Sequence, residues 1–303
     1  MYAKGMSQRD ITDIVEDIYG FQISHEQISI ITDSVLEELA AWQARPLKKC
    51  YAFMFIDCLY VNIRHETETV NSAIYVALAY DLSGKKEILG LWISENESKT
   101  EWLKIFDELK FRGLEDVFFI SMDGLNGLEE AASCCFPDAV IQRCIVHLIR
   151  NSVKYLSYKD RKAFCSQLKT IYKAPNKKVA LIEFQKLKEG WDKKAHGAVA
   201  VWERNWKHVE QLYDYTQAIR RVMYTTNAIE SVNFSFRKVT KKGGFPNEKA
   251  VFKVLFLRIL ELERKWSKKP VSNWFKVKNE LYMMEKFTER IDKYDIYEFP
   301  SMK

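Results

Sequence analysis

Three acidic residues that are far apart in the sequence have surroundings typical of a metal-dependent site. Asp57 follows the apolar run 51–56, Asp123 follows a second apolar run at 117–122, and Glu230 lies near the start of a helical pattern at 224–237. Magnesium prefers oxygen ligands and takes only a few carboxylates, and a pair of such ions can hold both oxygens in phosphoryl transfer. The three acids therefore predict a metal-dependent enzyme that acts on a nucleic-acid backbone.

Each acid also has a structural interpretation. An Asp at a strand end commonly caps the turn that follows, and Glu230 stands three residues after Asn227, which is the spacing of a capping box. Two aspartates that each end a buried apolar strand favour the metal site. Asn233 and Arg237 share the helix face of Glu230, so we expect them to approach the DNA backbone.

The elements that must position these acids form an α/β pattern. Apolar runs predict a strand at 51–56, extended by 59–63, and two more strands at 73–80 and 88–93, joined as an antiparallel meander. A helix over 99–111, a strand at 117–122, a further helix and a short strand at 139–141 follow. This order is that of an RNase H-like core, in which the first and fourth strands end side by side. It places Asp57 next to Asp123.

Helical segments flank this core. Residues 1–46 predict two helices, with capping boxes at Ser7–Asp10 and Ser24–Gln27. They are either a helix-turn-helix remnant or a helical hairpin that lies against the body. Residues 47–146 form the first part of the core, 147–223 an all-helical insertion, 224–290 the completing helices with a basic surface, and 291–303 a weakly ordered tail.

Positive charge is concentrated near the C-terminal end. The chain has a net charge of +6, and the stretch from Arg237 to Lys278 holds 13 Lys/Arg against 3 Asp/Glu. Such a block is an electrostatic footprint for phosphate polymers, with a solvated helical face as the alternative. We expect the DNA-binding side chains to be Arg150, Lys154, Asn233, Arg237, Lys238, Lys241 and Lys242.

Other sequence features limit the location of the protein. No apolar run is long enough for a membrane span, and no signal peptide is visible. Six cysteines without a CxxC pair indicate reduced thiols and a cytoplasmic protein. The pair Cys144 and His147 is an incomplete zinc half-site.

Several motifs together resemble those of the mutator-type transposases of bacterial insertion sequences, a DDE family with an RNase H-like core. The similarity covers the chain from Met1 to about Lys278. The matching stretches are Trp42-Gln-Ala-Arg-Pro46, Phe55-Ile-Asp-Cys-Leu-Tyr-Val-Asn-Ile-Arg64, Ser121-Met-Asp-Gly-Leu-Asn-Gly127, Arg143-Cys-Ile-Val-His-Leu-Ile-Arg-Asn-Ser152, Trp202-Glu-Arg-Asn-Trp206 and Tyr224-Thr-Thr-Asn-Ala-Ile-Glu-Ser-Val-Asn233.

The resemblance implies specific roles. Asp57, Asp123 and Glu230 become the catalytic, metal-binding triad for two Mg²⁺ ions, with Mn²⁺ as a substitute. Cys144 and His147 match a Cys-x-x-His signature. The implied partners are double-stranded DNA, as terminal inverted repeats and target, and further copies of the chain in a homo-oligomer. The implied activity is DNA strand cleavage and strand transfer at the element ends.

Two departures from the family pattern are visible. The sequence opens almost inside the motif Tyr2-Ala-Lys-Gly-Met-Ser7, which predicts a copy that lacks part of the N-terminal region, and Cys58-Leu-Tyr60 stands where the family often has Ala-Leu-His. The rival interpretations are a structure-specific nuclease on the same core and an inactive DNA-binding remnant of a transposable element.

Overall fold

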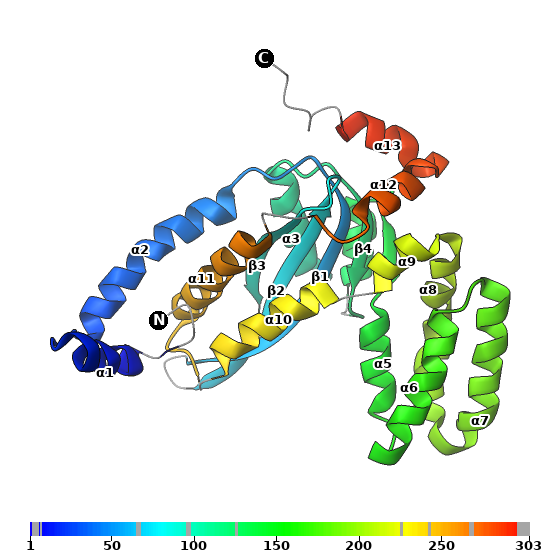
Figure 1. Ribbon diagram of the computed structural model, residues 1–303, viewed down its shortest axis with the longest axis horizontal. Helices are drawn as coiled ribbons and strands as arrows, with labels where there is room; N and C mark the ends of the chain where they lie inside the picture. The colour runs from blue at the N-terminus through cyan, green and yellow to red at the C-terminus, as the bar shows by residue number, and fades with distance from the viewer. Residues whose placement is uncertain are drawn as a thin grey trace.

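A five-stranded sheet forms the centre of the protein in the computed structural model, which describes residues 1, 6, 8–64, 68–94, 98–124, 127–224, 227–241, 244–266 and 270–295 (Figure 1). The strands are β1 Cys50–Arg64, β2 Thr69–Asp81, β3 Lys86–Ser94, β4 Asp116–Met122 and β5 Val140–Arg143. The first helices are α1 Gln8–Tyr19, α2 His25–Ala44, α3 Lys99–Phe111, α4 Leu128–Cys135, α5 Ile145–Val153, α6 Tyr158–Tyr172 and α7 Lys177–Arg204. The later ones are α8 Trp206–Gln211, the 3-10 turn η2 Leu212–Asp214, α9 Gln217–Tyr224, α10 Asn227–Thr240, α11 Glu248–Trp266, α12 Trp274–Tyr282 and α13 Glu285–Asp295.

The sheet is mixed, with the strand order β3-β2-β1-β4-β5. β1 pairs antiparallel with β2, and β2 pairs antiparallel with β3, so the predicted meander is confirmed. β4 and β5 then add in parallel on the other side of β1. The predicted order of three strands, helix, strand, helix, strand and helix is also confirmed. This topology makes β1 and β4 neighbours that run in the same direction.

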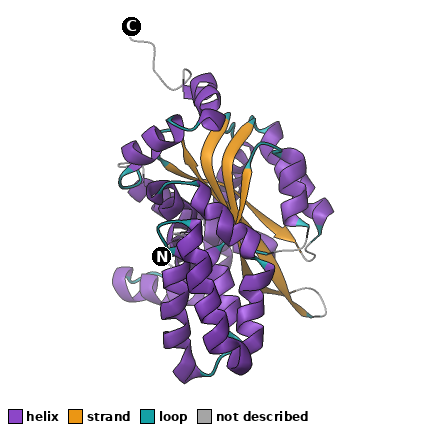
Figure 2. Cartoon of the chain, turned by 90° about the vertical axis from the view of Figure 1, so that its right-hand side faces the viewer, coloured by secondary structure: helices purple, strands orange, loops and turns teal. Residues whose placement is uncertain are grey.

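Helices cover both faces of the sheet (Figure 2). On one face α3 and α4 bury Trp102, Phe106 and Leu128 against alternate residues of β1 and β4. On the other face lie α10 and α11, and Figure 1 shows α10 (yellow) running across the strands. A sheet buried on both faces needs continuous apolar strands, which explains why the runs in β1 and β4 show no alternation.

The burial of β1 changes character at Asp57. From Cys50 to Asp57 every residue is buried, whereas from Leu59 to Arg64 buried and exposed side chains alternate. β4 accompanies β1 only as far as the pair Ile56↔Met122. Beyond that pair β1 continues alongside β2, and Ile63 makes an isolated parallel bridge to Phe245. Asp57 therefore lies inside the strand, and the predicted extension at 59–63 is confirmed. Asp57 stands where β1 loses its parallel neighbour.

The helical block from α5 to α9 is continuous with the sheet core. Its buried side chains belong to the same hydrophobic cluster as those of β1 and α10. Phe119 of β4 packs edge-on against Tyr215, with ring centroids 5.0 Å apart. The Gln142 amide of β5 donates to the carbonyl of His208 at 2.8 Å. The predicted all-helical character of this segment is confirmed, and its packing ties it directly to the β4–β5 side of the sheet.

Helices α2 and α13, near the two ends of the described chain, pack against the body. The capping box of Ser24 and Gln27 is confirmed, while Ser7 lies outside the described residues. α2 lies along α11, where Trp42 packs on Phe256 with ring centroids 5.6 Å apart. α13 buries Ile291 and Tyr294 and continues to Asp295, so the weakly ordered tail does not begin at residue 291. Among the described helices, none combines the length and apolar character that crossing a membrane requires.

Candidate active site

Asp57 and Asp123 lie on neighbouring strands, one residue beyond the last parallel pair, Ile56↔Met122. Oδ1 of Asp57 accepts the N–H of Cys58 at 2.8 Å, and Oδ1 of Asp123 accepts the N–H of Gly124 at 2.7 Å. Asp57 is only 5% exposed. The prediction that the topology brings the two aspartates side by side is confirmed.

His147 contacts both aspartates. Its Nε2 lies 3.6 Å from Oδ1 of Asp57 and 3.9 Å from Oδ2 of Asp123. The other ring nitrogen, Nδ1, is buried and has no hydrogen-bond partner among the described residues. The imidazole thus sits over the carboxylate pair as a polar neighbour that carries positive charge when it is protonated.

Helix α5 follows β5 in the chain and places His147 here because its N-terminal end is hydrogen-bonded to the last residue of β4. Cys144 is the N-cap residue, and its N–H donates to the carbonyl of Met122 at 2.8 Å. The Cys144 side chain is buried. His147 follows almost one helical turn later and faces the carboxylates. Cys144, the first residue of the Cys-x-x-His motif, therefore anchors α5 to the end of β4, and His147, the last residue of the motif, contacts the carboxylates. The N-terminal end of α5, which carries the positive end of the helix dipole, lies near the acids.

Helix α10 reaches the same cluster from the other end of the sequence. The Asn233 amide nitrogen donates to Oδ2 of Asp57 at 2.6 Å, and Asn233 is 2% exposed. Glu230 lies one turn earlier, where its Oε1 accepts a short hydrogen bond from the Arg150 guanidinium. Glu230 is therefore on the same side of the sheet as the two aspartates.

Arg150 connects the third acid to the first two. Arg150 forms an ion pair with Glu230, and the NH1 nitrogen of Arg150 lies 3.4 Å from Nε2 of His147. Within the described residues, no group of three or more His, Cys, Asp or Glu side chains is arranged to hold a metal ion. Glu230 is thus linked to the aspartate pair through Arg150 and His147.

Burial dominates the electrostatics of Asp57. Desolvation raises the pKa of its carboxyl, and the nearby Asp123 charge raises it further. His147, the Cys58 N–H and Arg150 lower it and offset part of this rise. Two adjacent carboxylates, one of them buried, repel one another unless positive charge joins them.

A divalent cation fits this donor set. Magnesium in proteins commonly takes one or two carboxylates and completes its shell with water and phosphate oxygens. Asp57 and Asp123 supply two carboxylates: Oδ2 of Asp123 lies outside the backbone hydrogen bonds described above, while Oδ2 of Asp57 accepts from the Asn233 amide. Buried oxygens of Ser121 and Asn233 near Asp57 also have no partner among the described residues.

The predicted DNA-binding residues fall into different environments. Arg237, Lys238 and Lys241 are exposed along or just after α10, and Lys238 lies 4.6 Å over the ring of Phe234. Lys154 ends α5 and donates to Asn151 at 2.8 Å. Lys242 lies outside the described residues.

Two side chains expected to contact DNA are engaged by the acids in this structure. Asn233 is buried on Asp57, and Arg150 is paired with Glu230. The sequence did not predict that His147 contacts both aspartates. The helical spacing of His147 and Arg150 was the available signal, because residues three apart share a helix face.

Comparison with known proteins identifies the family. Residues 1–269 match the model of the Mutator family of transposases, and the chain belongs to this family. It is 41% identical over 292 residues to a probable transposase for an ISRM3-like insertion sequence element of Sinorhizobium fredii and to the transposase for ISRM3 of Rhizobium meliloti. Each alignment covers 96% of this chain and 72% of the relative. The transposase for IS1201 of Lactobacillus helveticus is 33% identical over 256 residues, an alignment that covers 83% of this chain and 68% of the relative.

Proposed function

We propose that this chain is a transposase that cuts DNA at the ends of an insertion sequence and joins the freed strand to a target, on an RNase H-like core. The observation that carries the proposal is the meeting of Asp57 and Asp123 at the end of the β1–β4 pairing, with α10 bringing Glu230 to their side. Membership of a family whose relatives are named transposases supports it.

Asp57 and Asp123 are the residues that would hold Mg²⁺. Glu230 would join them when another anion takes its place on Arg150. When bound, the metal ions supply charge neutralisation for the phosphate and a lower pKa for water. Asn233 fixes the carboxylate of Asp57 through its 2.6 Å hydrogen bond. Such a partner orients a ligand and tunes it, so its loss costs activity even though it does not touch the metal.

Arg150 has two competing anions in this scheme. In the DNA-free protein its guanidinium pairs with Glu230. Arginine binds phosphate as well as carboxylate in a two-pronged geometry. A DNA phosphate that takes Arg150 would release Glu230 toward the aspartates. DNA binding and completion of the acidic cluster are then coupled through one side chain.

The reaction has two displacement steps at phosphorus. Water attacks the phosphodiester at the element end, the bond to the 3′ oxygen breaks, and a 3′-hydroxyl is freed. That hydroxyl then attacks a phosphodiester of the target, so that a new bond to the 3′ oxygen forms as a target strand bond breaks. The protein side chains position the phosphates and carry no covalent intermediate. We also propose that the chain acts as a homo-oligomer, because the two element ends must be held near each other while each is joined to the target.

A strand-transfer assay with labelled element ends and target DNA tests the function. We expect Asp57→Asn, Asp123→Asn and Glu230→Gln each to reduce joined product by more than about 100-fold. A variant that stays within about twofold of the parent excludes that residue from the acidic triad. Cleavage without joined product in the parent would indicate a structure-specific nuclease instead. DNA binding with neither product, in Mg²⁺ or Mn²⁺, would indicate an inactive remnant.

A further inference from the structure

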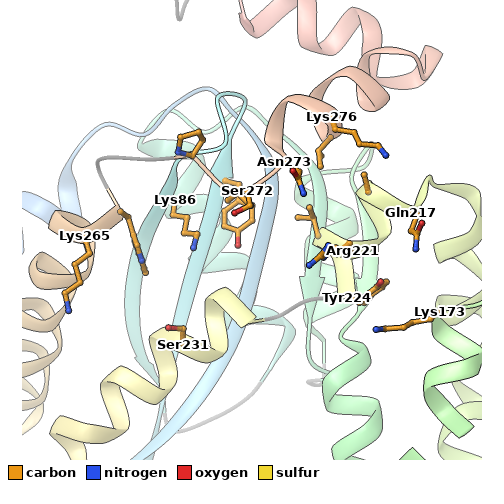
Figure 3. A pocket seen from close by; sticks show the side chains of 17 residues that line it. Lys86, Lys173, Gln217, Arg221, Tyr224, Ser231, Lys265, Ser272, Asn273 and Lys276 are labelled. Carbon is orange, nitrogen blue, oxygen red and sulfur yellow. The ribbon is translucent and has the colours of Figure 1, made fainter. Parts of the chain in front are cut away.

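A groove of about 980 Å³ lies on the face of the protein that carries α10. Figure 3 shows it bounded by α10 below, by the end of α11 and β3 on one side, by α6 and α9 on the other, and by the 270–277 segment above. Lys265 and Lys276 of the basic stretch 237–278 line it, whereas the described side chains expected to bind DNA individually, such as Arg150 and Arg237, do not. The groove is separate from the acidic cluster described above.

The charge of the groove has one sign. Of the 17 described residues that line it, five are lysine or arginine and none is acidic, although Lys276 lies 3.8 Å from the carboxylate of Glu280 outside the lining. The five are Lys86 of β3, Lys173 after α6, Arg221 of α9, Lys265 of α11 and Lys276 of α12. They come from five different elements, so the fold gathers them and no single charged helix face accounts for them. Concentrated positive charge in a concave site attracts anions.

Lys86 shows the cost of this arrangement. It is half-buried, burial lowers the pKa of its ammonium, and its Nζ lies 5.7 Å over the ring of Trp266. Keeping a half-buried ammonium out of water is unfavourable unless an anion joins it. The chemistry of the groove therefore indicates an anionic ligand with oxygen acceptors.

The groove is a built feature of the fold. Its upper wall is fixed to the β2–β3 turn by Val271, whose N–H donates to the carbonyl of Gly84 at 2.9 Å. The Trp274 indole N–H donates to the carbonyl of Leu82 at 3.0 Å. Asn273 in the same wall has φ 62°, a left-handed conformation uncommon outside glycine. These contacts hold the wall in place over the sheet.

Helix α10 separates the groove from the acidic cluster and belongs to both. Ser231 of α10 lines the groove, whereas Glu230 and Asn233 of the same helix face the acidic cluster. In Figure 3 Lys265 and Lys173 lie at opposite ends of the groove, with Ser231 between them. A long polyanion laid along the groove would touch both ends and pass beside the reacting site.

We propose that this groove binds the phosphate backbone of DNA, as a second contact surface beside the acidic cluster. The inference rests on the proposed function, because it takes the polyanion to be the DNA that the site acts on. A backbone with regularly spaced phosphates fits cations spread along a groove better than a single phosphate group does. Inorganic phosphate and mononucleotides share the oxyanion chemistry and serve as competing arms of the test.

The test measures binding of the full chain to labelled DNA in the presence of a chelator, so that no chemistry occurs. Lys173→Gln/Lys265→Gln removes two exposed cations from the two ends of the groove. Lys49→Gln/Lys104→Gln is the charge-matched control, because both lysines are exposed in surface ion pairs outside the groove. Anisotropy is recorded at several salt concentrations with duplex and with single-stranded DNA.

We expect the groove variant to bind about tenfold or more weakly at low salt. The dependence of its affinity on salt should become weaker. The plot of log affinity against log salt should be shallower by about 0.9 per lost phosphate contact on duplex DNA, or by about 0.7 on a single strand. The control should keep the parental slope. A groove variant with the parental slope on both DNA forms overturns the inference. Mononucleotide or inorganic phosphate that binds as tightly as the oligonucleotide also overturns it.

The outcome is distinguishable from failure of the proposed function. If the groove variant binds normally while Asp57→Asn loses strand transfer, only the groove assignment fails. If the groove variant loses binding while Asp57→Asn keeps strand transfer, only the catalytic assignment fails. A parent that binds neither DNA form contradicts both.

Discussion

The Asn233 amide nitrogen donates a 2.6 Å hydrogen bond to Oδ2 of Asp57, across 176 positions of sequence. This bond joins α10 to the central strand at the point where β4 stops pairing with it. It also sets the rotation of α10, so that Glu230, one turn earlier, faces the aspartate side of the sheet. A single buried contact thereby brings the last acid of the sequence to the first two.

Removing this amide should weaken activity without removing an acid. We expect Asn233→Ala to lower strand transfer by about 10- to 100-fold and to raise the Mg²⁺ concentration needed for half-maximal rate, because an outer partner of a metal ligand is lost. Asn71→Ala, at an exposed position of β2, is the control. An Asn233→Ala protein with unchanged rate and metal dependence would show that the amide has no positioning role.

The Arg150–Glu230 pair predicts a change in metal binding by the DNA-free protein. With Arg150 in place, Glu230→Gln should leave Mn²⁺ affinity nearly unchanged, because its carboxylate is already engaged. Arg150→Ala should tighten Mn²⁺ binding several-fold, and Arg150→Ala/Glu230→Gln should return it to the parental value. Isothermal titration measures all four proteins. Equal affinity in the parent and Arg150→Ala contradicts the competition between Glu230 and Arg150.

The C-terminal helix α13 should contribute to global stability. Arg290 donates to both carboxylate oxygens of Asp116 and to the carbonyls of Asp138 and Val117, and its side chain is 17% exposed. We expect Arg290→Ala to lower the free energy of unfolding by about 2 kcal/mol or more, because Asp116 loses its partner. Arg204→Ala, at the exposed end of α7, should change it by less than about 0.5 kcal/mol. Urea denaturation distinguishes the two.

His208 should make stability depend on pH. Burial lowers the pKa of its imidazole, Arg143 and Lys207 lower it further, and Glu129 offsets part of the shift. A folded-state pKa below the unfolded value of about 6.5 means that the unfolded chain binds the proton more tightly. Stability is then fully present above about pH 6.5 and falls as the pH drops below it.

The test of this linkage is the difference between two proteins. His208→Gln keeps a polar side chain but cannot titrate, so its free energy of unfolding should fall less steeply than that of the parent between about pH 7 and 5. Denaturation at several pH values gives both curves. Parallel curves would mean that His208 has the same pKa in the folded and unfolded chains.

Much of the sheet was predictable because buried strands are continuous apolar runs. The runs at 51–56 and 117–122 correctly predicted the parallel neighbours that bring Asp57 and Asp123 together. The continuation of β1 past Asp57 was predicted as an extension at 59–63, although burial there alternates and a polar residue interrupts the apolar run. Asp57 is tolerated in the strand because the Cys58 N–H and Asn233 satisfy its oxygens.

The contacts of Arg150 and Asn233 could not be predicted from local patterns. Both depend on how α5 and α10 are placed relative to each other, and these helices are 80 residues apart at the Arg150–Glu230 pair. A basic or amide side chain on a helix face looks the same in sequence whether it meets solvent, DNA or a carboxylate. The lysines of the groove share this difficulty, because they come from five separate elements.

Replacing Asp57 by cysteine tests most directly whether this carboxylate holds the metal used in strand transfer. A thiolate is a poor ligand for the hard ion Mg²⁺ and a better one for the softer Mn²⁺. Asp57→Cys should therefore give no joined product in Mg²⁺ and recover product in Mn²⁺, with Asp57→Ala inactive in both. An Asp57→Cys protein that matches the parent in Mg²⁺, or that stays folded and inactive in both metals, would contradict a metal-holding role for Asp57.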